Sequence, residues 1–134
     1  MHYQISATSV FNNDASILVK EADINFGTTV KTANSLPNPA ELFLGSFAAC
    51  MLKNVERFSE LMKFTYHRTA LEVKAERLDN PPRMENIVYS LTIFSDDIKL
   101  NTSLLKKNIE KHGTIYNTVK LSCNISGTIN TILQ

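Results

Sequence analysis

The chain has 134 residues, of which 43% are hydrophobic and 20% charged, a size and composition that predict one globular domain over residues 1–134. Its net charge of +1 gives no basic excess that would indicate a nucleic-acid-binding surface. No apolar run reaches the roughly 18–20 residues of a membrane span, and the first residues lack the regions of a secretory signal. We therefore expect a cytoplasmic protein with no nucleic-acid or membrane partner. In that reducing compartment, Cys50 and Cys123 are not expected to form a structural disulfide.

The first third of the chain predicts short strands. Residues 2–10 alternate polar and apolar side chains, as a half-buried strand does. A turn cluster at 12–14 is followed by an apolar run at 16–20, and residues 24–32 predict a further hairpin. A loop over residues 33–37 leads to the next element.

The strongest pattern is a long helix over residues 38–63. Asn38, Pro39 and Glu41 have the spacing of an N-cap, a first-turn proline and the glutamate of a capping box. Apolar residues then recur at steps of three and four and form one continuous face. These residues are Leu44, Phe47, Met51, Val55, Phe58 and Met62. Further apolar residues widen the face in the first half, so we expect a central, buried helix.

The second half of the chain predicts a hairpin, a helix and a last strand. Residues 66–78 and 84–94 alternate apolar and polar side chains on either side of an Asp-Asn-Pro-Pro break, which predicts a hairpin with a longer loop. A second helix is expected over residues 101–112, with Gly113 as its C-cap. Residues 121–132 predict the last strand. Strands followed by helices in this order indicate an α+β fold.

Cys50 is the leading candidate for a reactive residue. Attack on a peroxide requires a thiolate, which needs stabilising neighbours and an entry path. Lys53, Asn54 and Arg57 follow at three, four and seven residues, on the same helix face, and would supply positive charge and a hydrogen bond. Alternatively, Cys50 is a small residue packed among its apolar neighbours.

For Cys123 and the histidines, the sequence pattern favours structural roles. Cys123 alternates with Ile125 and Ile129 in the last predicted strand, which indicates packing. His112 ends the second predicted helix, where a protonated ring would be favoured; near Cys50 it would instead serve as a base or proton relay. The other two histidines have no ligand spacing with either cysteine, so no metal or cofactor is predicted.

Glu41 has two possible roles. Nine helical residues put it about 180° around the helix from Cys50 and roughly 13 Å along it, so the two cannot touch within one straight helix. Glu41 is therefore either a capping residue paired with Asn38 or a site residue that a partner chain brings to Cys50.

Two segments carry a resemblance to a known family. Residues 38–50, NPAELFLGSFAAC, resemble the signature of the OsmC/Ohr family, in which a cysteine follows the glutamate after nine residues. Residues 111–120, KHGTIYNTVK, resemble the family's second motif. The resemblance extends to the element order over essentially the whole chain. It implies an OsmC-like fold, with antiparallel sheets packed around a long buried central helix and a second helix, in an intertwined homodimer.

The resemblance also implies a thiol-dependent reductase of organic hydroperoxides that acts in oxidative stress defence. Cys50 matches the peroxidatic cysteine, and Glu41 matches the glutamate found nine residues before it. The family's resolving cysteine falls on Gly113, and no arginine precedes Arg57, so the family's N-terminal arginine is missing. An external small or protein thiol would then restore the enzyme.

The implied site has an apolar wall and two cations. Phe43, Phe47 and Tyr116 would favour organic hydroperoxides over hydrogen peroxide, while Lys53 and Arg57 would support the thiolate. Two other functions stay open. In one, the protein is a non-catalytic dimer that binds a small apolar ligand. In the other, it is a structural dimer in which both cysteines serve only as packing residues.

Overall fold

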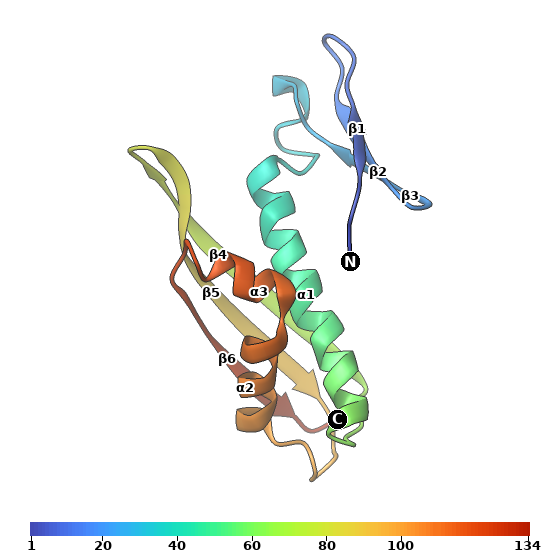
Figure 1. Ribbon diagram of the computed structural model, residues 1–134, viewed down its shortest axis with the longest axis vertical. Helices are drawn as coiled ribbons and strands as arrows, with labels where there is room; N and C mark the ends of the chain where they lie inside the picture. The colour runs from blue at the N-terminus through green and yellow to red at the C-terminus, as the bar shows by residue number, and fades with distance from the viewer. The chain divides into compact units, whose positions relative to one another are not determined.

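The computed structural model describes all 134 residues (Figure 1). The chain forms two compact units, Met1–Phe43 and Leu44–Gln134. The long helix α1, Pro39–Leu61, begins in the first unit and continues through the second. None of the helices combines the length and the hydropathy that crossing a membrane would need.

The first unit contains a three-stranded antiparallel sheet in the order β1 (Ser6–Thr8), β2 (Ala15–Val19), β3 (Ala22–Phe26). β1 is shorter than the predicted strand because only these three residues pair with β2. The hairpin expected over 24–32 is wrong. β3 instead forms an antiparallel hairpin with the preceding strand β2, and Lys20 in the turn between them has a φ of 55°. Val30–Thr32 forms a short 3₁₀ helix, η1, instead of a strand.

Asp14 explains why the chain leaves the extended conformation after β3. Its Oδ1 atom accepts hydrogen bonds from the Thr28 nitrogen at 3.0 Å, the Thr29 nitrogen at 3.2 Å and the Thr32 hydroxyl at 2.7 Å. These bonds, the Thr32 hydroxyl foremost, lower the pKa of Asp14. A side chain from the preceding turn thus holds the threonines in a turn.

The first turn of α1 confirms the predicted capping box. The Glu41 nitrogen donates to Asn38 Oδ1 at 2.9 Å, and the Asn38 nitrogen donates to Glu41 Oε1 at 3.0 Å. The helix then begins at Pro39, where the missing N–H costs no intrahelical hydrogen bond.

The second unit contains a mixed sheet in the order β4 (Arg68–Asp79), β5 (Pro82–Phe94), β6 (Ile125–Ile132). β4 and β5 are antiparallel, whereas β5 and β6 are parallel, so the wholly antiparallel arrangement is wrong. The reason is the helical crossover between β5 and β6, which lets the last strand run in the same direction (Figure 1). The β4–β5 turn contains only two residues, Asn80 and Pro81, fewer than expected.

Three helices pack against this sheet: the part of α1 in the second unit, α2 (Thr102–His112) and α3 (Thr114–Val119). The Asn101 side chain caps α2 by accepting from the Leu104 nitrogen at 3.0 Å, which agrees with the predicted start of this helix at 101. The fully buried side chains come from α1, α2 and β5, and are Phe47, Met51, Val55, Ile87, Tyr89, Leu91, Ile93, Leu105 and Ile109. Only one face of α1 is covered, and Ala49 and Leu52 are exposed. In the single chain the helix is therefore not enclosed all round.

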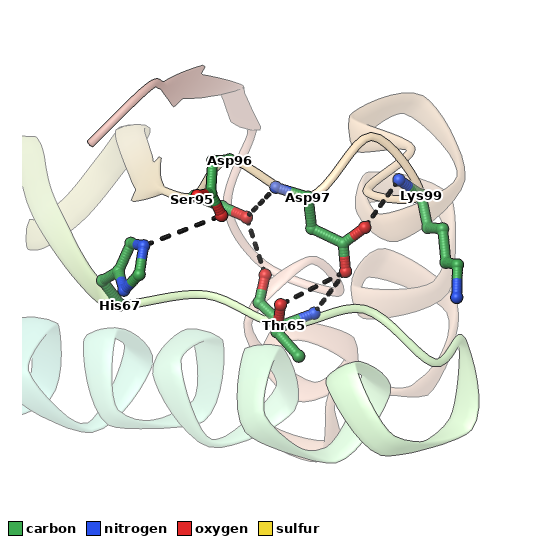
Figure 2. A network of polar contacts seen from close by, with 6 residues as sticks. All are labelled: Thr65, His67, Ser95, Asp96, Asp97 and Lys99. Atoms are coloured by element: carbon green, nitrogen blue, oxygen red, sulfur yellow. Dashed lines mark hydrogen bonds and ion pairs between the residues drawn. The ribbon is translucent and has the colours of Figure 1, made fainter.

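The loops at one end of the sheet are joined by hydrogen bonds (Figure 2). Asp97 accepts from the backbone nitrogens of Thr65 and Lys99, both at 2.8 Å. Ser95 Oγ donates to the Thr65 carbonyl at 2.7 Å. The bonds to Asp97, that from Lys99 foremost, lower the pKa of its carboxyl. Hydrogen bonds thus connect the segment that follows α1 to the segment that follows β5.

Candidate active site

Cys50 lies half-buried on α1, next to the short connection between α2 and α3. A Cβ atom built on Gly113 would lie 3.3 Å from the Cys50 sulfur and 3.1 Å from Tyr116 Cβ. The same point is 2.9 Å from the Ile109 carbonyl oxygen. The Cys50 thiol, which is not in a disulfide, therefore sits against a backbone that leaves no room for a side chain at 113 without local movement.

Asn54, one turn after Cys50, provides hydrogen bonds to it. The Asn54 amide nitrogen donates to the Cys50 carbonyl at 2.8 Å and lies 3.6 Å from the Cys50 sulfur. Because a carbonyl can only accept, this contact requires the NH₂ side of the amide to face Cys50. One N–H is then directed to the carbonyl and the second is available to the sulfur.

Aromatic rings lie beside this part of α1. Phe47 is fully buried, and its ring centroid is 6.0 Å from that of Tyr116 and 6.2 Å from that of Tyr89. The Tyr89 hydroxyl donates to Glu110 at 2.8 Å, and burial together with that carboxylate raises its pKa. Burial and the same carboxylate raise the pKa of Tyr116 to about 12. Both phenols are therefore neutral near pH 7.

Glu110 was not predicted from the sequence. It accepts from Tyr89 and pairs with Lys106 at 3.0 Å. A buried tyrosine needs a partner for its hydroxyl, but nothing in the spacing of residues 89 and 110 identifies that partner. Only the packing of α2 on β5 brings the two together.

The two cations predicted to support the Cys50 thiolate, Lys53 and Arg57, are exposed side chains. Arg57 is exposed and its guanidinium carbon lies 5.3 Å from the centroid of the Phe58 ring. Lys53 is exposed, and neither cation hydrogen-bonds Cys50. His112 ends α2, exposed, with its ring 5.8 Å from the Phe58 ring. Roles for these residues in catalysis stay predictions.

Two predicted site residues, Glu41 and Phe43, belong to the first unit. Glu41 takes part in the capping box, and Phe43 is 37% exposed. Their contribution to the chemistry of Cys50 stays a prediction.

Cys123 is not in the last strand, contrary to expectation. The nitrogens of Ser122 and Cys123 both donate to the Val119 carbonyl at 3.0 Å, so the turn that follows α3 includes Cys123, and β6 starts at Ile125. The Cys123 sulfur lies 3.4 Å from the Met84 carbonyl and packs, partly buried, against the core. No group of three or more His, Cys, Asp or Glu side chains is close enough together to hold a metal ion.

Comparison with known proteins identifies the family. Residues 32–127 match the family model described as OsmC-like protein, and the chain belongs to this family. One relative is the hydroperoxide reductase of Mycoplasma genitalium, 27% identical over 141 residues that cover 96% of this chain and 99% of the relative.

Solved structures share the fold. An OsmC-like protein from Mycoplasma pneumoniae superposes with a TM-score of 0.83 at 17% identity, over 99% of this chain and 97% of that one. An organic hydroperoxide resistance protein from Elizabethkingia anophelis gives a TM-score of 0.72 at 13% identity, over 98% and 99% of the two chains. The predicted α+β OsmC-like fold is confirmed.

Proposed function

We propose that the protein is a thiol-dependent reductase of organic hydroperoxides with Cys50 as the nucleophile. The observation that carries the proposal is the half-buried Cys50 thiol beside Gly113, on the central helix of an OsmC-like chain. The name of the M. genitalium relative, hydroperoxide reductase, supports the same reaction.

The reaction begins with the Cys50 thiolate. Its sulfur attacks the outer oxygen of the hydroperoxide, an S–O bond forms, and the O–O bond breaks. The products are the sulfenic acid of Cys50 and an alkoxide, which takes a proton to become the alcohol. Sulfur is oxidised by two electrons and the peroxide is reduced by two.

An external thiol completes the cycle. Gly113 has no sulfur, and Cys123 lies in the turn before β6 beside Met84. A first thiol therefore displaces the sulfenate oxygen as water and forms a mixed disulfide, which a second thiol reduces. Cys50 returns to the thiol, and the two external thiols leave as a disulfide.

The aromatic residues support an organic substrate. Phe47 and Tyr116 are buried rings that make the core beside this part of α1 apolar, and the neutral phenols place no negative charge there. Apolar surface favours an alkyl or aryl hydroperoxide over hydrogen peroxide.

The working form is a homodimer. The first unit exposes Phe11 and Val30, and the second exposes Ala49 and Leu52 on α1. Large apolar side chains exposed on a protein surface are typical of surfaces that a partner covers. Sedimentation equilibrium tests this directly, since a stable monomer at micromolar concentration would contradict it.

Peroxide consumption tests the function. The reduced wild-type protein is mixed with cumene hydroperoxide and a dithiol, and peroxide loss is followed together with a sulfenate-specific label. We expect turnover and labelling in the wild type and in Cys123→Ser, and neither in Cys50→Ser. Equal consumption by wild type and Cys50→Ser would overturn the proposal.

A further inference from the structure

We infer that Asn54 is a catalytic residue whose side-chain amide donates a hydrogen bond to the Cys50 thiolate. The inference rests on the proposed function and adds to it the group that stabilises the nucleophile. The side-chain donor that the structure places at the Cys50 sulfur is the Asn54 amide.

The geometry of Asn54 suits this role. Its amide nitrogen is 3.6 Å from the Cys50 sulfur, within the range of an N–H···S hydrogen bond, while the bond to the Cys50 carbonyl holds the amide in orientation. The residue is only 8% exposed, so water competes little for the donor. A donor fixed before ionisation stabilises the thiolate more than the neutral thiol.

The burial of Asn54 is not explained by a structural link to another element. Asparagine is a poor helix former, and a buried amide costs free energy that a leucine at the same place would not. Asn54 and Ser95 are the buried polar residues, and Ser95 joins two loops through Thr65 and Asp97. Asn54 makes no such link, because both partners of its amide nitrogen are atoms of Cys50.

Reactivity of the thiol separates this role from a purely structural one. Asn54→Leu removes the donor at similar volume, and Asn54→Asp replaces it with a carboxylate that repels a thiolate. Ser59→Ala is the matched control, since the Ser59 hydroxyl donates at 2.7 Å to a carbonyl of the same helix, that of Glu56, and not to Cys50. Alkylation of Cys50 by iodoacetamide is measured for each in a Cys123→Ser background.

We expect Asn54→Leu to alkylate about tenfold more slowly than wild type at pH 7, and Asn54→Asp more slowly still. Ser59→Ala should match the wild type. Near pH 10.5, where a cysteine is largely ionised without help, the Leu variant should approach the wild-type rate. kcat/KM for cumene hydroperoxide should fall in parallel at pH 7.

Equal alkylation rates for wild type and both Asn54 variants at pH 7 would overturn the inference. If the variants do not fold, NMR of the wild type decides: the Asn54 side-chain amide signals should shift as Cys50 ionises, and unchanged signals would overturn it. Alkylation does not require turnover. A wild type that consumes no peroxide therefore overturns the proposed function, whereas unchanged alkylation overturns only the role of Asn54.

Discussion

The sulfur of Cys50 lies 3.3 Å from the point that a Cβ atom of Gly113 would occupy. Residues 63 positions apart in the chain are therefore neighbours, and the side of Cys50 facing Gly113 meets backbone and not a second thiol. A cysteine placed at position 113 therefore offers a direct test of this proximity.

Gly113→Cys should form a disulfide with Cys50 after oxidation. A disulfide requires the Cβ of one cysteine to lie close to the sulfur of the other, and the φ of −69° at Gly113 is one that any residue can adopt. The Ile109 carbonyl at 2.9 Å from the new Cβ requires a small shift of the connection. Peptide mapping by mass spectrometry after one equivalent of cumene hydroperoxide should detect the cross-link.

Two further variants serve as controls for that cross-link. Gly113→Cys combined with Cys50→Ser should give no intramolecular disulfide, and Gly113→Ala should show the steric effect alone. Free thiols at both positions after oxidation of a folded Gly113→Cys would contradict the proximity.

Gly127→Ala should destabilise the second unit. Gly127 pairs with Tyr89 on β5, and a Cβ there would overlap the buried Tyr89 ring. Overpacking of this kind costs about 1–3 kcal/mol in the free energy of unfolding, which urea denaturation measures. The exposed neighbour Ser126→Ala should stay within about 0.5 kcal/mol of wild type, and equal stability of both variants would be inconsistent with the contact.

Glu41 variants should separate capping from catalysis. Glu41→Ala removes the acceptor for the Asn38 nitrogen and should lower the free energy of unfolding by about 0.5–1 kcal/mol. Glu41→Gln keeps a capping-box acceptor and should lose less. If Glu41→Gln also loses peroxide turnover, the carboxylate has a chemical role beyond the cap; full turnover would leave capping alone.

Asp97 should contribute to stability at neutral pH but not in acid. Its pKa lies below the ordinary value of 3.8 because the native carboxylate accepts hydrogen bonds from Lys99 and Thr65. The folded state thus binds the proton less tightly than the unfolded state does. The stabilisation is present above the ordinary pKa and is lost as the pH falls through the lowered one.

Asp97→Asn tests this sign. Thermal unfolding should show the variant less stable than wild type at pH 7, with the difference shrinking toward pH 2 as the wild-type carboxyl is protonated. A difference that grows in acid would contradict the direction of the shift.

Local patterns determined the helices and most strands. Asn38 and Glu41 formed the predicted capping box, Asn101 capped α2, and the alternation predicted over residues 84–94 appears in the burial of β5, because caps and periodicity are set by neighbours in the chain. The same reasoning failed where a distant partner intervened. Asp14 holds Thr28 and Thr32, 14 and 18 residues later, in a turn instead of a strand. Cys123 was misplaced for a local reason, because its nitrogen donates to the Val119 carbonyl in the turn that follows α3.

The candidate site divides in the same way. The sequence by itself determined that Cys50 and Asn54 share a helix face, since four residues make about one turn. Only the tertiary structure decided that Gly113 backs the sulfur and that Glu110 meets Tyr89, and it also made β6 parallel to β5. These contacts depend on how α2 and α3 pack on α1 and the sheet. Such packing is fixed by the summed burial of many side chains and not by the spacing of any two residues.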